Sequence, residues 1–212
     1  MQYLRQLFRL VVLLALTIVF LQTCWAHRGS IYPGNTICRP LLPLGITCEE
    51  RISVPEPIKD VQPGDLLVTF STHTLGWRHG HAALVIDSET ILEAVMPGSV
   101  SGFSSPNHWA SYSSLLHLRV KDASAQQRTA AAEYAKQHLY GLPYGFFCGL
   151  GAEKAPAAPA RLHCAYLPWY AWQHQDVDLD SDGGRIITVM DLTQSPHLEI
   201  ISARGQPLPN RK

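Results

Sequence analysis

The chain has 212 residues, 46% of them hydrophobic, and its 17 basic side chains balance its 17 acidic ones. This length and composition suit one globular domain. The absence of net charge argues against a nucleic-acid partner that relies on a basic surface, so we expect no such partner and look for a local site instead.

The N-terminus has the pattern of a secretory signal. Two arginines precede an apolar run over residues 10–21, which is the order of the basic and apolar regions of a signal peptide. The run is shorter than the ~20 residues that span a bilayer comfortably. We therefore expect residues 1–26 to be removed by cleavage after Ala26, which places the protein in the periplasm or cell envelope. Lipidation at Cys24 and retention of the segment as a membrane anchor are the alternatives.

Export changes how the cysteines are interpreted, because an oxidising compartment permits disulfides. Residues 27–57 are rich in proline and show little periodicity, so we expect an irregular lead-in. Cys38 and Cys48 are close in sequence within it, and a disulfide between them would stabilise the segment by ~2 to 3 kcal/mol. For Cys148 and Cys164, a second disulfide is one alternative. The other is an inert, buried Cys148 beside a reactive Cys164.

The domain proper, residues 58–212, is expected to begin with strands. The expected strands are 61–70, 79–87, 90–96 and 115–120, and residues 101–114 are expected to form a loop. The second and third of these strands are separated by a tight turn around Ser88, which indicates a hairpin.

The clearest helix covers residues 124–141, where Ser124 and Gln127 can form a capping box and Gly141 provides a C-terminal stop. An Ala/Pro linker over residues 151–160 follows, and then a second helix and an acidic stretch. The last two expected strands are 185–192 and 197–202. These elements predict an α+β domain.

The start of the second helix bears on chemistry, because Pro168 lies only four residues after Cys164 in the stretch "RLHCAYLPWYAW". Proline is tolerated only in the first turn of a helix, where its missing N–H is not needed. The helix must therefore begin close to Cys164, and the thiol lies near the positive end of the helix dipole, where the thiolate is favoured. The aromatic residues that follow recur at helical spacing, which is typical of core packing.

A thiolate nucleophile needs a base, and the base needs a third group to orient it. His81 opens the apolar strand "HAALVI", and Glu93 is a carboxylate inside the apolar "ILEAVM". A three-residue turn centred on Ser88 would set His81 opposite Val95, with Glu93 diagonally across on the same face. His79 shares that face and is the alternative base.

Other polar residues are expected to have lesser roles. Asp65 follows a glycine in a turn and is assigned a structural role. The acidic stretch "DVDLDSDGG" matches the first half of a calcium-binding loop, but Val189 occupies the twelfth position, which requires a glutamate. We therefore expect neither a metal nor a cofactor.

Six motifs, "GDLLVTF", "GHAALVI", "ILEAV", "GLPYGF", "LHCAYLPW" and "IITVMDLTQSPHLEII", occur in this order. Together they resemble the YiiX/YebB-type branch of the NlpC superfamily, the permuted papain-like hydrolases, over residues 61–201. The resemblance implies a circularly permuted papain-like fold, with an antiparallel sheet packed against a helix led by the nucleophile. It also implies that Cys164 is the nucleophile, His81 the base and Glu93 the orienting residue.

The chain departs from the family pattern beside the nucleophile. The family commonly has Ser-Glu after the cysteine and a tyrosine before it, whereas this chain has Ala165 and Tyr166 after it and His163 before it. His163 and Tyr166, together with His79, are expected to line the site. These departures bear on substrate preference.

We therefore expect an exported cysteine hydrolase of the peptidase or amidase type. Its substrate would be peptide-like, with cell-wall fragments as an example, and cleavage would pass through an acyl thioester. Hydrolysis of a lipid ester, or acyl transfer, by the same three residues is the first alternative. A binding module that keeps the fold without catalysis is the second.

Overall fold

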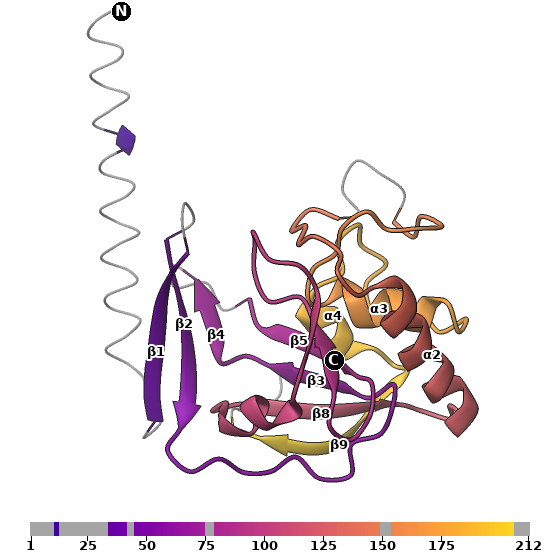
Figure 1. Ribbon diagram of the computed structural model, residues 1–212, viewed down its shortest axis with the longest axis horizontal. Coiled ribbons are helices and arrows are strands. Elements are labelled where there is room, and N and C mark those ends of the chain that lie inside the picture. The colour runs from indigo at the N-terminus through magenta and orange to yellow at the C-terminus, as the bar shows by residue number, and fades with distance from the viewer. Residues whose placement is uncertain (1–10, 13–33, 42–44, 75–78, 149–153, 206–212) are drawn as a thin grey trace, which may run out of the picture.

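The computed structural model describes residues 11–12, 34–41, 45–74, 79–148 and 154–205. Antiparallel sheets and a few helices make up an α+β fold (Figure 1). Apart from residues 11 and 12, the predicted signal segment lies outside the described residues. Within the described ranges, no helix has the length and apolar character needed to cross a membrane.

The larger sheet has six strands in the order β7-β6-β5-β3-β8-β9, and each neighbouring pair is antiparallel. Its strands are β3 (Leu66–Thr69), β5 (His81–Val85), β6 (Ile91–Glu93), β7 (Gly102–Ser104), β8 (Leu115–Val120) and β9 (Leu198–Arg204). The predicted strands that contain β3, β5, β6 and β8 are thereby confirmed, as is the predicted strand 197–202, which overlaps β9.

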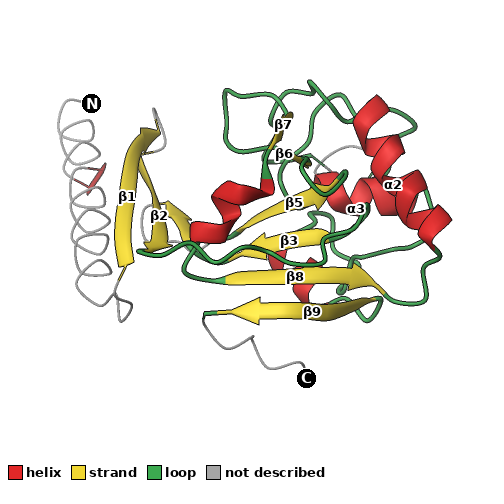
Figure 2. Ribbon diagram, turned by 60° about the horizontal axis from the view of Figure 1, so that its bottom comes forward, coloured by secondary structure: helices red, strands yellow, loops and turns green. Residues whose placement is uncertain are grey.

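Each face of this sheet has its own core, because side chains alternate along a strand. The helices are α2 (Ala125–His138), α3 (Tyr166–Gln173) and α4 (Val189–Gln194), with the 3₁₀ helix η2 (Pro106–Ser111). Leu66 and Leu84 belong to a core that includes residues of α2, α3 and α4. Leu67 and Ala83 belong to the opposite core, which includes Trp109 of η2. Helices α2 and α3 pack against each other (Figure 2).

Helix α2 lies within its predicted range. The hydroxyl of Ser124 accepts a hydrogen bond from the N–H of Gln127, and the Gln127 side chain accepts one from the N–H of Ser124, so the predicted capping box is confirmed. Beyond the helix, Gly141 has a φ of +77°, the left-handed conformation that favours glycine.

Helix α3 begins where Pro168 requires it to begin. Ala165 is the N-cap, so Cys164 lies one residue before the cap and Pro168 is the third helical residue. The N–H of Leu167 donates to the carbonyl of His163 at 3.1 Å, which is the first helical hydrogen bond. The predicted helix start close to Cys164 is confirmed.

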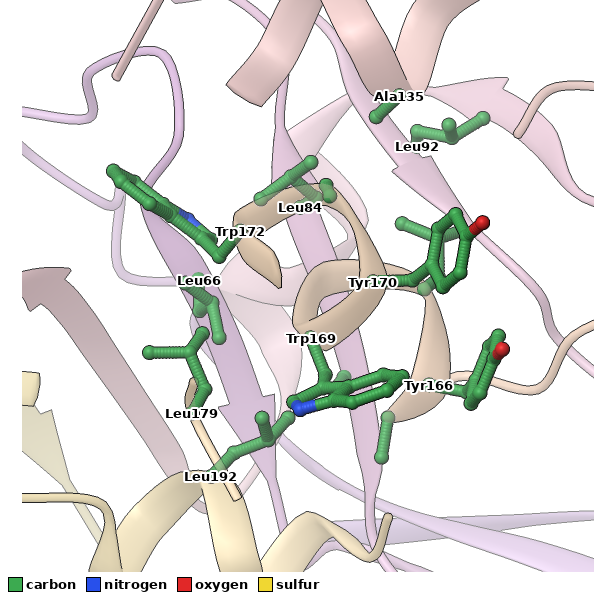
Figure 3. Packing of buried hydrophobic residues seen from close by; sticks show 14 of the residues in the cluster. Leu66, Leu84, Leu92, Ala135, Tyr166, Trp169, Tyr170, Trp172, Leu179 and Leu192 are labelled. Carbon is green, nitrogen blue, oxygen red and sulfur yellow. The ribbon is translucent and has the colours of Figure 1, made fainter. Parts of the chain in front are cut away.

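The aromatic residues of α3 anchor it in the core (Figure 3). Trp169 and Trp172 are at most 2% exposed, and burial of such a side chain contributes on the order of 2 kcal/mol. Their indole N–H groups donate to the Asp178 carboxylate at 2.7 Å and to the Gly64 carbonyl at 2.9 Å. Core packing is therefore the role of this stretch, and Cys164 precedes a firmly held helix.

The expectation of an irregular lead-in is wrong over its described part. β1 (Gly34–Leu41) and β2 (Gly45–Ile52) form an antiparallel hairpin, and β4 (Thr72–Thr74) pairs with β2. Backbone pairing needs no hydrophobic alternation, and Pro40 lies on β1, an edge strand of its sheet, where a proline is tolerated. Because β4 lies inside the domain, its pairing attaches the hairpin to the domain.

The register of this hairpin bears on the predicted disulfide. Cys38 lies directly opposite Cys48, and residues opposite each other on antiparallel strands have Cα atoms about 4.5 to 5.5 Å apart. That separation falls within the range of disulfides. The disulfide itself stays a prediction.

Residues 185–192 do not form the predicted strand. Their second half belongs to helix α4, which begins after the N-cap Thr188. Thr188 accepts a hydrogen bond from the N–H of Asp191, and Asp191 accepts one from the N–H of Thr188. This local capping box outweighs the strand preference of the β-branched residues around it.

Residues 101–114 also differ from the predicted loop, because they contain β7 and η2. β7 pairs with β6 and has only three residues, too few for alternation to be recognised in the sequence. Ser105 caps η2 by accepting a hydrogen bond from the N–H of Asn107, and Pro106 follows it. Serine followed by proline is a helix-start signal that the sequence interpretation passed over.

Candidate active site

Strands β5 and β6 pair in the predicted register. Ala83 lies opposite Glu93, so the register is centred on Ser88 and His81 points to the same face as Glu93. His81 Nε2 lies 2.9 Å from Glu93 Oε2. The predicted contact between the two side chains is confirmed.

These two side chains lie on the sheet face that carries Trp109, whereas α3 covers the opposite face. Side chains alternate, so Ala82 packs in the core that contains α3 while His81 points the other way. His81 still reaches Cys164 because it is the first residue of β5, at the end of the strand. The predicted packing of a helix against the sheet is therefore found, but His81 and Cys164 meet at the end of β5 and not across the sheet face that α3 covers.

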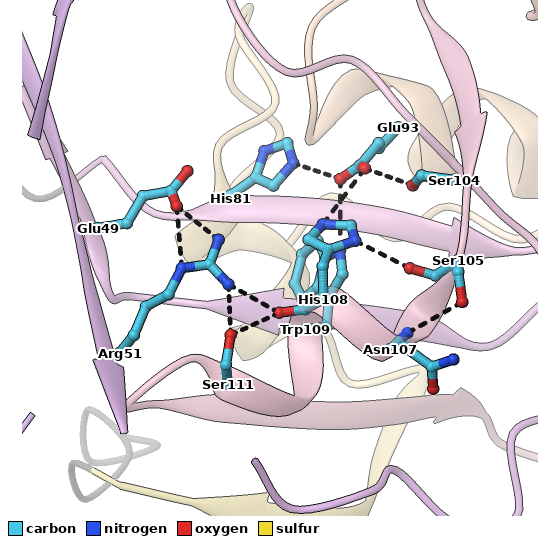
Figure 4. A network of polar contacts seen from close by, with 10 residues as sticks. All are labelled: Glu49, Arg51, His81, Glu93, Ser104, Ser105, Asn107, His108, Trp109 and Ser111. Carbon is cyan, nitrogen blue, oxygen red and sulfur yellow. Dashed lines mark hydrogen bonds and ion pairs between the residues drawn. The ribbon is translucent and has the colours of Figure 1, made fainter. Parts of the chain in front are cut away.

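Glu93 is buried among hydrogen-bond donors (Figure 4). Ser104 Oγ donates to Oε1 at 2.5 Å and Trp109 Nε1 donates to Oε2 at 3.3 Å, while His108 Nε2 lies 3.4 Å from Oε1. Burial alone would raise the pKa of Glu93, but its contacts with His108 and His81 hold that pKa well below the usual value. Glu93 is therefore an ionised carboxylate, which can orient the His81 imidazole and stabilise its protonated form.

Ser104, His108 and Trp109 are site residues that the sequence interpretation missed. All three come from the segment that was expected to be a loop. A serine, a histidine and a tryptophan within six residues were a signal. The pairing of β7 with β6 brings Ser104 to Glu93, and the placement of η2 brings His108 and Trp109 there.

His81 lies between a carboxylate and a thiol. Its ring stacks on Trp109, with centroids 5.2 Å apart and planes inclined by 22°, and the residue is 6% exposed. Burial would lower the pKa of His81, but hydrogen bonds with Cys164 and Glu93 outweigh it and raise the pKa to about 10. His81 is therefore an imidazolium at neutral pH, with an anionic partner on each side.

Cys164 is a free thiol and, unlike His81, is partly exposed. Burial of its sulfur would raise the pKa, but His163 and His81 beside it hold the pKa of Cys164 well below the usual value for a thiol. The start of α3 acts in the same direction through the helix dipole. These neighbours therefore favour the thiolate form of Cys164, a residue that is partly exposed.

Cys148 is also a free thiol, so the alternative of a disulfide between Cys148 and Cys164 is wrong for this structure. Cys148 is half-buried and packs against the core that contains α3. It lies beside His163, which makes it a neighbour of the site.

His163 is close to both thiols and is 6% exposed. Its Nδ1 accepts a hydrogen bond from the N–H of Tyr166 at 3.3 Å. Burial would lower the pKa of His163, but the thiols of Cys148 and Cys164 raise that pKa above the usual value. The expectation that His163 lines the site agrees with this position.

Tyr166 and His79 occupy less central positions than expected. The Tyr166 side chain packs in the core, and its hydroxyl donates to the Lys154 carbonyl at 2.8 Å, so it borders the site through its backbone. His79 Nδ1 lies 2.7 Å from the Gly80 carbonyl oxygen. The histidines beside Cys164 are His81 and His163, which favours His81 over His79 as the base.

Tyr144 is a further site residue that the sequence interpretation missed. A backbone bridge joins it to Leu162, two residues before Cys164. Burial raises the pKa of Tyr144, and the charges on Cys164 and Cys148 raise it further, so the phenol stays protonated. The motif "GLPYGF" contains this residue, but nothing in the motif indicated a role for the tyrosine hydroxyl.

The N-terminal hairpin supports the site from outside. Arg51 on β2 donates from Nη1 to the His108 carbonyl at 3.0 Å and also contacts Ser111, and its guanidinium lies 4.6 Å from the Tyr112 ring centroid (Figure 4). Glu49 accepts from the same guanidinium at 2.6 Å. The hairpin therefore fixes the position of η2, which carries His108.

Asp65 has the structural role that was predicted for it. It is fully buried and lies 2.7 Å from His117 Nε2, and Arg119 donates to both of its oxygens, at 2.8 and 2.7 Å. The N–H of Gln62 donates to it as well, at 2.8 Å. Burial would raise the pKa of Asp65, but the hydrogen bonds from Arg119 and His117 lower it.

In the described residues, then, an α+β fold brings a thiol, two histidines and a glutamate together at the end of one strand of an antiparallel sheet. No family model matches the chain. No curated protein matches its sequence. A solved structure, the metalloprotein yiiX from Escherichia coli O157:H7, is similar at 15% identity with a TM-score of 0.51, over 68% of this chain and 98% of that one. At this identity the likeness concerns the fold, so the protein has a yiiX-like fold.

Proposed function

We propose that this protein is an exported cysteine hydrolase with a permuted papain-like arrangement, which cleaves an amide bond in a peptide-like substrate. The observation that carries the proposal is a partly exposed thiol, Cys164, beside a buried imidazole, His81, that is itself hydrogen-bonded to Glu93. A nucleophile, a base and an orienting group in this order are the parts of a catalytic triad. The basic and apolar N-terminal segment supports export.

In the first half of the reaction, the Cys164 thiolate adds to the acyl carbon and forms the carbon–sulfur bond. The carbonyl electrons move to oxygen, and their return expels the amine, to which the His81 imidazolium gives its proton. Glu93 holds the imidazole in the orientation that this transfer needs. In the second half, neutral His81 takes a proton from water, the water oxygen attacks the thioester, and the thiolate leaves.

The oxyanion needs N–H donors at the start of α3. The N–H groups of Tyr166 and Leu167 are already bonded to His163. For the N–H groups of Cys164 and Ala165, no acceptor is found among the described residues. We therefore assign the oxyanion to these two groups, in which position each contributes roughly 3 kcal/mol to transition-state stabilisation.

One observation favours the second candidate function, hydrolysis of a lipid ester or acyl transfer by the same residues. Phe146 and Phe147, immediately before Cys148, are 40% and 65% exposed, and Phe103 and Tyr140, both exposed, stack at 4.7 Å. Exposed apolar side chains of this kind suit an acyl chain. The amide remains the first choice because the triad alone requires no apolar substrate.

The similar structure is a metalloprotein, which raises the question of a metal in this chain. Among the described residues, ligand atoms of Asp180, Asp182 and Asp191 lie within 4.8 Å of one another. The Lys154 ammonium is paired with Asp180, and Asp191 is engaged by the capping box of α4. An ammonium on one carboxylate and a helix cap on another do not fit a cation site, so no step of the mechanism uses one.

The proposal is tested by labelling the full chain with a peptidyl chloromethyl ketone, a thiol-directed electrophile that carries an amide mimic. We expect peptide mapping to find the label on Cys164, and His81→Ala to slow the labelling strongly at neutral pH. Cys148→Ser and His79→Ala are the matched controls and should label as the unchanged protein does. Turnover of cell-wall peptides compared with acyl lipids then separates the two candidate functions.

No reaction at Cys164, or labelling that is independent of His81, would rule out the hydrolase. The binding module would then be the remaining interpretation of the fold.

A further inference from the structure

The turn of η2 that carries Trp109 is bound by an arginine from the last strand of the sheet. Arg204 ends β9 and lies opposite Leu115 on β8. The next residue, Gly205, has a φ of +85°, and a Cβ atom there would collide with the Ser113 carbonyl. Glycine therefore lets the end of β9 press against the segment that follows η2, which brings the arginine side chain to that helix.

The guanidinium of Arg204 binds the C-terminal end of η2. Nη2 lies 2.9 Å from the Ala110 carbonyl oxygen, 3.0 Å from that of Tyr112 and 3.3 Å from that of Trp109. Nη1 donates to the Glu56 carbonyl at 3.1 Å. The last carbonyls of a helix lack partners within it and carry partial negative charge, so a cation with several donors stabilises them.

A second arginine binds the same turn from another sheet. Arg51, on β2 of the three-stranded sheet, donates to the His108 carbonyl at 3.0 Å and contacts Ser111 (Figure 4). Arg204, on the six-stranded sheet, binds the carbonyls of residues 109, 110 and 112. The backbone position of Trp109 therefore depends on both arginines.

That backbone position matters to the site because only the χ1 and χ2 torsions separate it from the indole. The indole of Trp109 is buried, donates to Glu93 Oε2 at 3.3 Å and stacks with His81 at 5.2 Å. The hydrogen bond is already longer than the usual range of about 2.7 to 3.2 Å, so a small further shift would break it. In a close-packed core the ring has no space in which to compensate by a change of rotamer.

We propose that Arg204 is a positioning residue of the active site, which holds η2 so that Trp109 keeps Glu93 and His81 in the orientation that the reaction needs. This rests on the proposed function. The donors of Nη1 and Nη2 are bonded within the protein, so Arg204 acts through Trp109 and not on the substrate. Its removal should slow the chemical step and leave substrate binding unchanged.

Two variants of the full chain test the proposal. Arg204→Met keeps the bulk of the side chain and removes its donors, whereas Arg204→Lys offers one nitrogen in place of the two that bind η2 and Glu56. The matched control is Arg119→Met, because Arg119 also donates several hydrogen bonds but binds the structural Asp65 and the Asp60 carbonyl. Urea unfolding shows whether each variant is folded.

The first readout is the NMR signal of the Trp109 indole N–H, assigned with Trp109→Phe. A hydrogen bond to a carboxylate moves such a signal to lower field, so the signal reports the contact with Glu93 whether or not a substrate is known. We expect Arg204→Met to move it to higher field and Arg204→Lys to move it less. Arg119→Met should leave it in place.

The second readout is the rate of Cys164 labelling by the peptidyl chloromethyl ketone. At saturating ketone we expect Arg204→Met to lower the rate about tenfold, because a misplacement of ~1 Å can cost ~100-fold. The concentration that gives half the maximal rate should stay within about twofold, since Arg204 does not bind the substrate. Arg119→Met, compared at equal amounts of folded protein, should change neither value.

An unchanged indole signal and an unchanged maximal rate in folded Arg204→Met would overturn this inference and leave the proposed function standing. An equal loss in Arg119→Met would also overturn it, because the effect would then be one of general stability. If Arg204→Met does not fold, the same comparisons apply to Arg204→Lys. If Cys164 of the unchanged protein does not react with the ketone, the proposed function fails, and the indole signal alone decides whether Arg204 holds Trp109.

Discussion

Two buried carboxylate–histidine pairs in the described part of the chain have nearly equal geometry. Asp65 and His117 lie 2.7 Å apart, and Glu93 and His81 lie 2.9 Å apart. The first pair is fully sealed from solvent and its carboxylate is also bound by Arg119. The second pair is slightly exposed and lies at the end of a strand.

The difference between the pairs is in the second nitrogen of each histidine. His117 Nδ1 is buried without a hydrogen-bond partner among the described residues, so the ring can only tie Asp65 in place. The other side of His81 is occupied by the Cys164 thiol. A buried carboxylate–histidine pair is structural where no reactive group adjoins it, and it suits catalysis where a thiol does.

The largest effect should come from the pair beside the thiol. His81→Ala removes both the proton donor for the leaving group and the cation of the ion pair, so the acylation rate should fall about 10²- to 10⁴-fold. Single-turnover release of the amine from a peptide substrate measures it. The matched variant His117→Ala, compared at equal amounts of folded protein, should leave the rate unchanged. A similar loss in both variants would erase the distinction between the pairs.

Asp65→Asn should affect stability in place of activity. It leaves Arg119 and His117 without their charged partner, which costs about 3 to 5 kcal/mol for a buried pair. Urea unfolding measures this difference. Because the pKa of Asp65 is lowered in the folded state, its contribution is present above the unfolded value of 3.8 and is lost as the pH falls through the lower folded value.

Glu93→Gln is the control for that experiment, since it changes the equivalent carboxylate of the other pair. It should lower activity more than it lowers the free energy of unfolding. The account of Asp65 would be contradicted if folded Asp65→Asn protein lost activity while keeping its stability.

Reduction of the predicted disulfide in the β1–β2 hairpin should have an intermediate effect on stability. If Cys38 and Cys48 are joined, reduction should lower the free energy of unfolding by about 2 to 3 kcal/mol and loosen Arg51, which holds η2. Peptide mapping without reductant detects the joined pair. Two free thiols in protein recovered from its native compartment would show that the hairpin is held by its strands alone.

The smallest expected effect is that of His108, the second histidine on Glu93. Its side chain is about a third exposed and lies 3.4 Å from the carboxylate, so removing it should lower activity only about two- to fivefold. His108→Ala is compared with Asn107→Ala on the same turn, which should have no effect. A loss as large as that of His81→Ala would mean that His108 transfers the proton.

The pair beside the thiol could be predicted from the sequence, because its geometry is local. The turn centred on Ser88 and the alternation of β5 and β6 set His81 and Glu93 on one face, and Pro168 required α3 to begin near Cys164. These arguments involve only residues close in the chain.

Two kinds of feature could not be predicted from the sequence. In one, local preferences for helix and strand compete, and in the other, the contact joins residues that are far apart in the chain. α4 replaced an expected strand because Thr188 and Asp191 cap each other, which outweighs the strand preference of their neighbours. His108 and Trp109 reach Glu93 only because Arg51, more than fifty residues away, holds η2 in place. No local pattern contains that contact.

The central claim is that Cys164 is a thiolate paired with the His81 imidazolium, and the rate of its alkylation against pH tests it most directly. The account predicts a midpoint well below the ~8.5 of a free cysteine, because two histidines and the start of α3 stabilise the anion. In His81→Ala the midpoint should rise yet stay below that value, since His163 and the helix remain. A midpoint at or above ~8.5 in the unchanged protein, or no change on removing His81, would contradict the account.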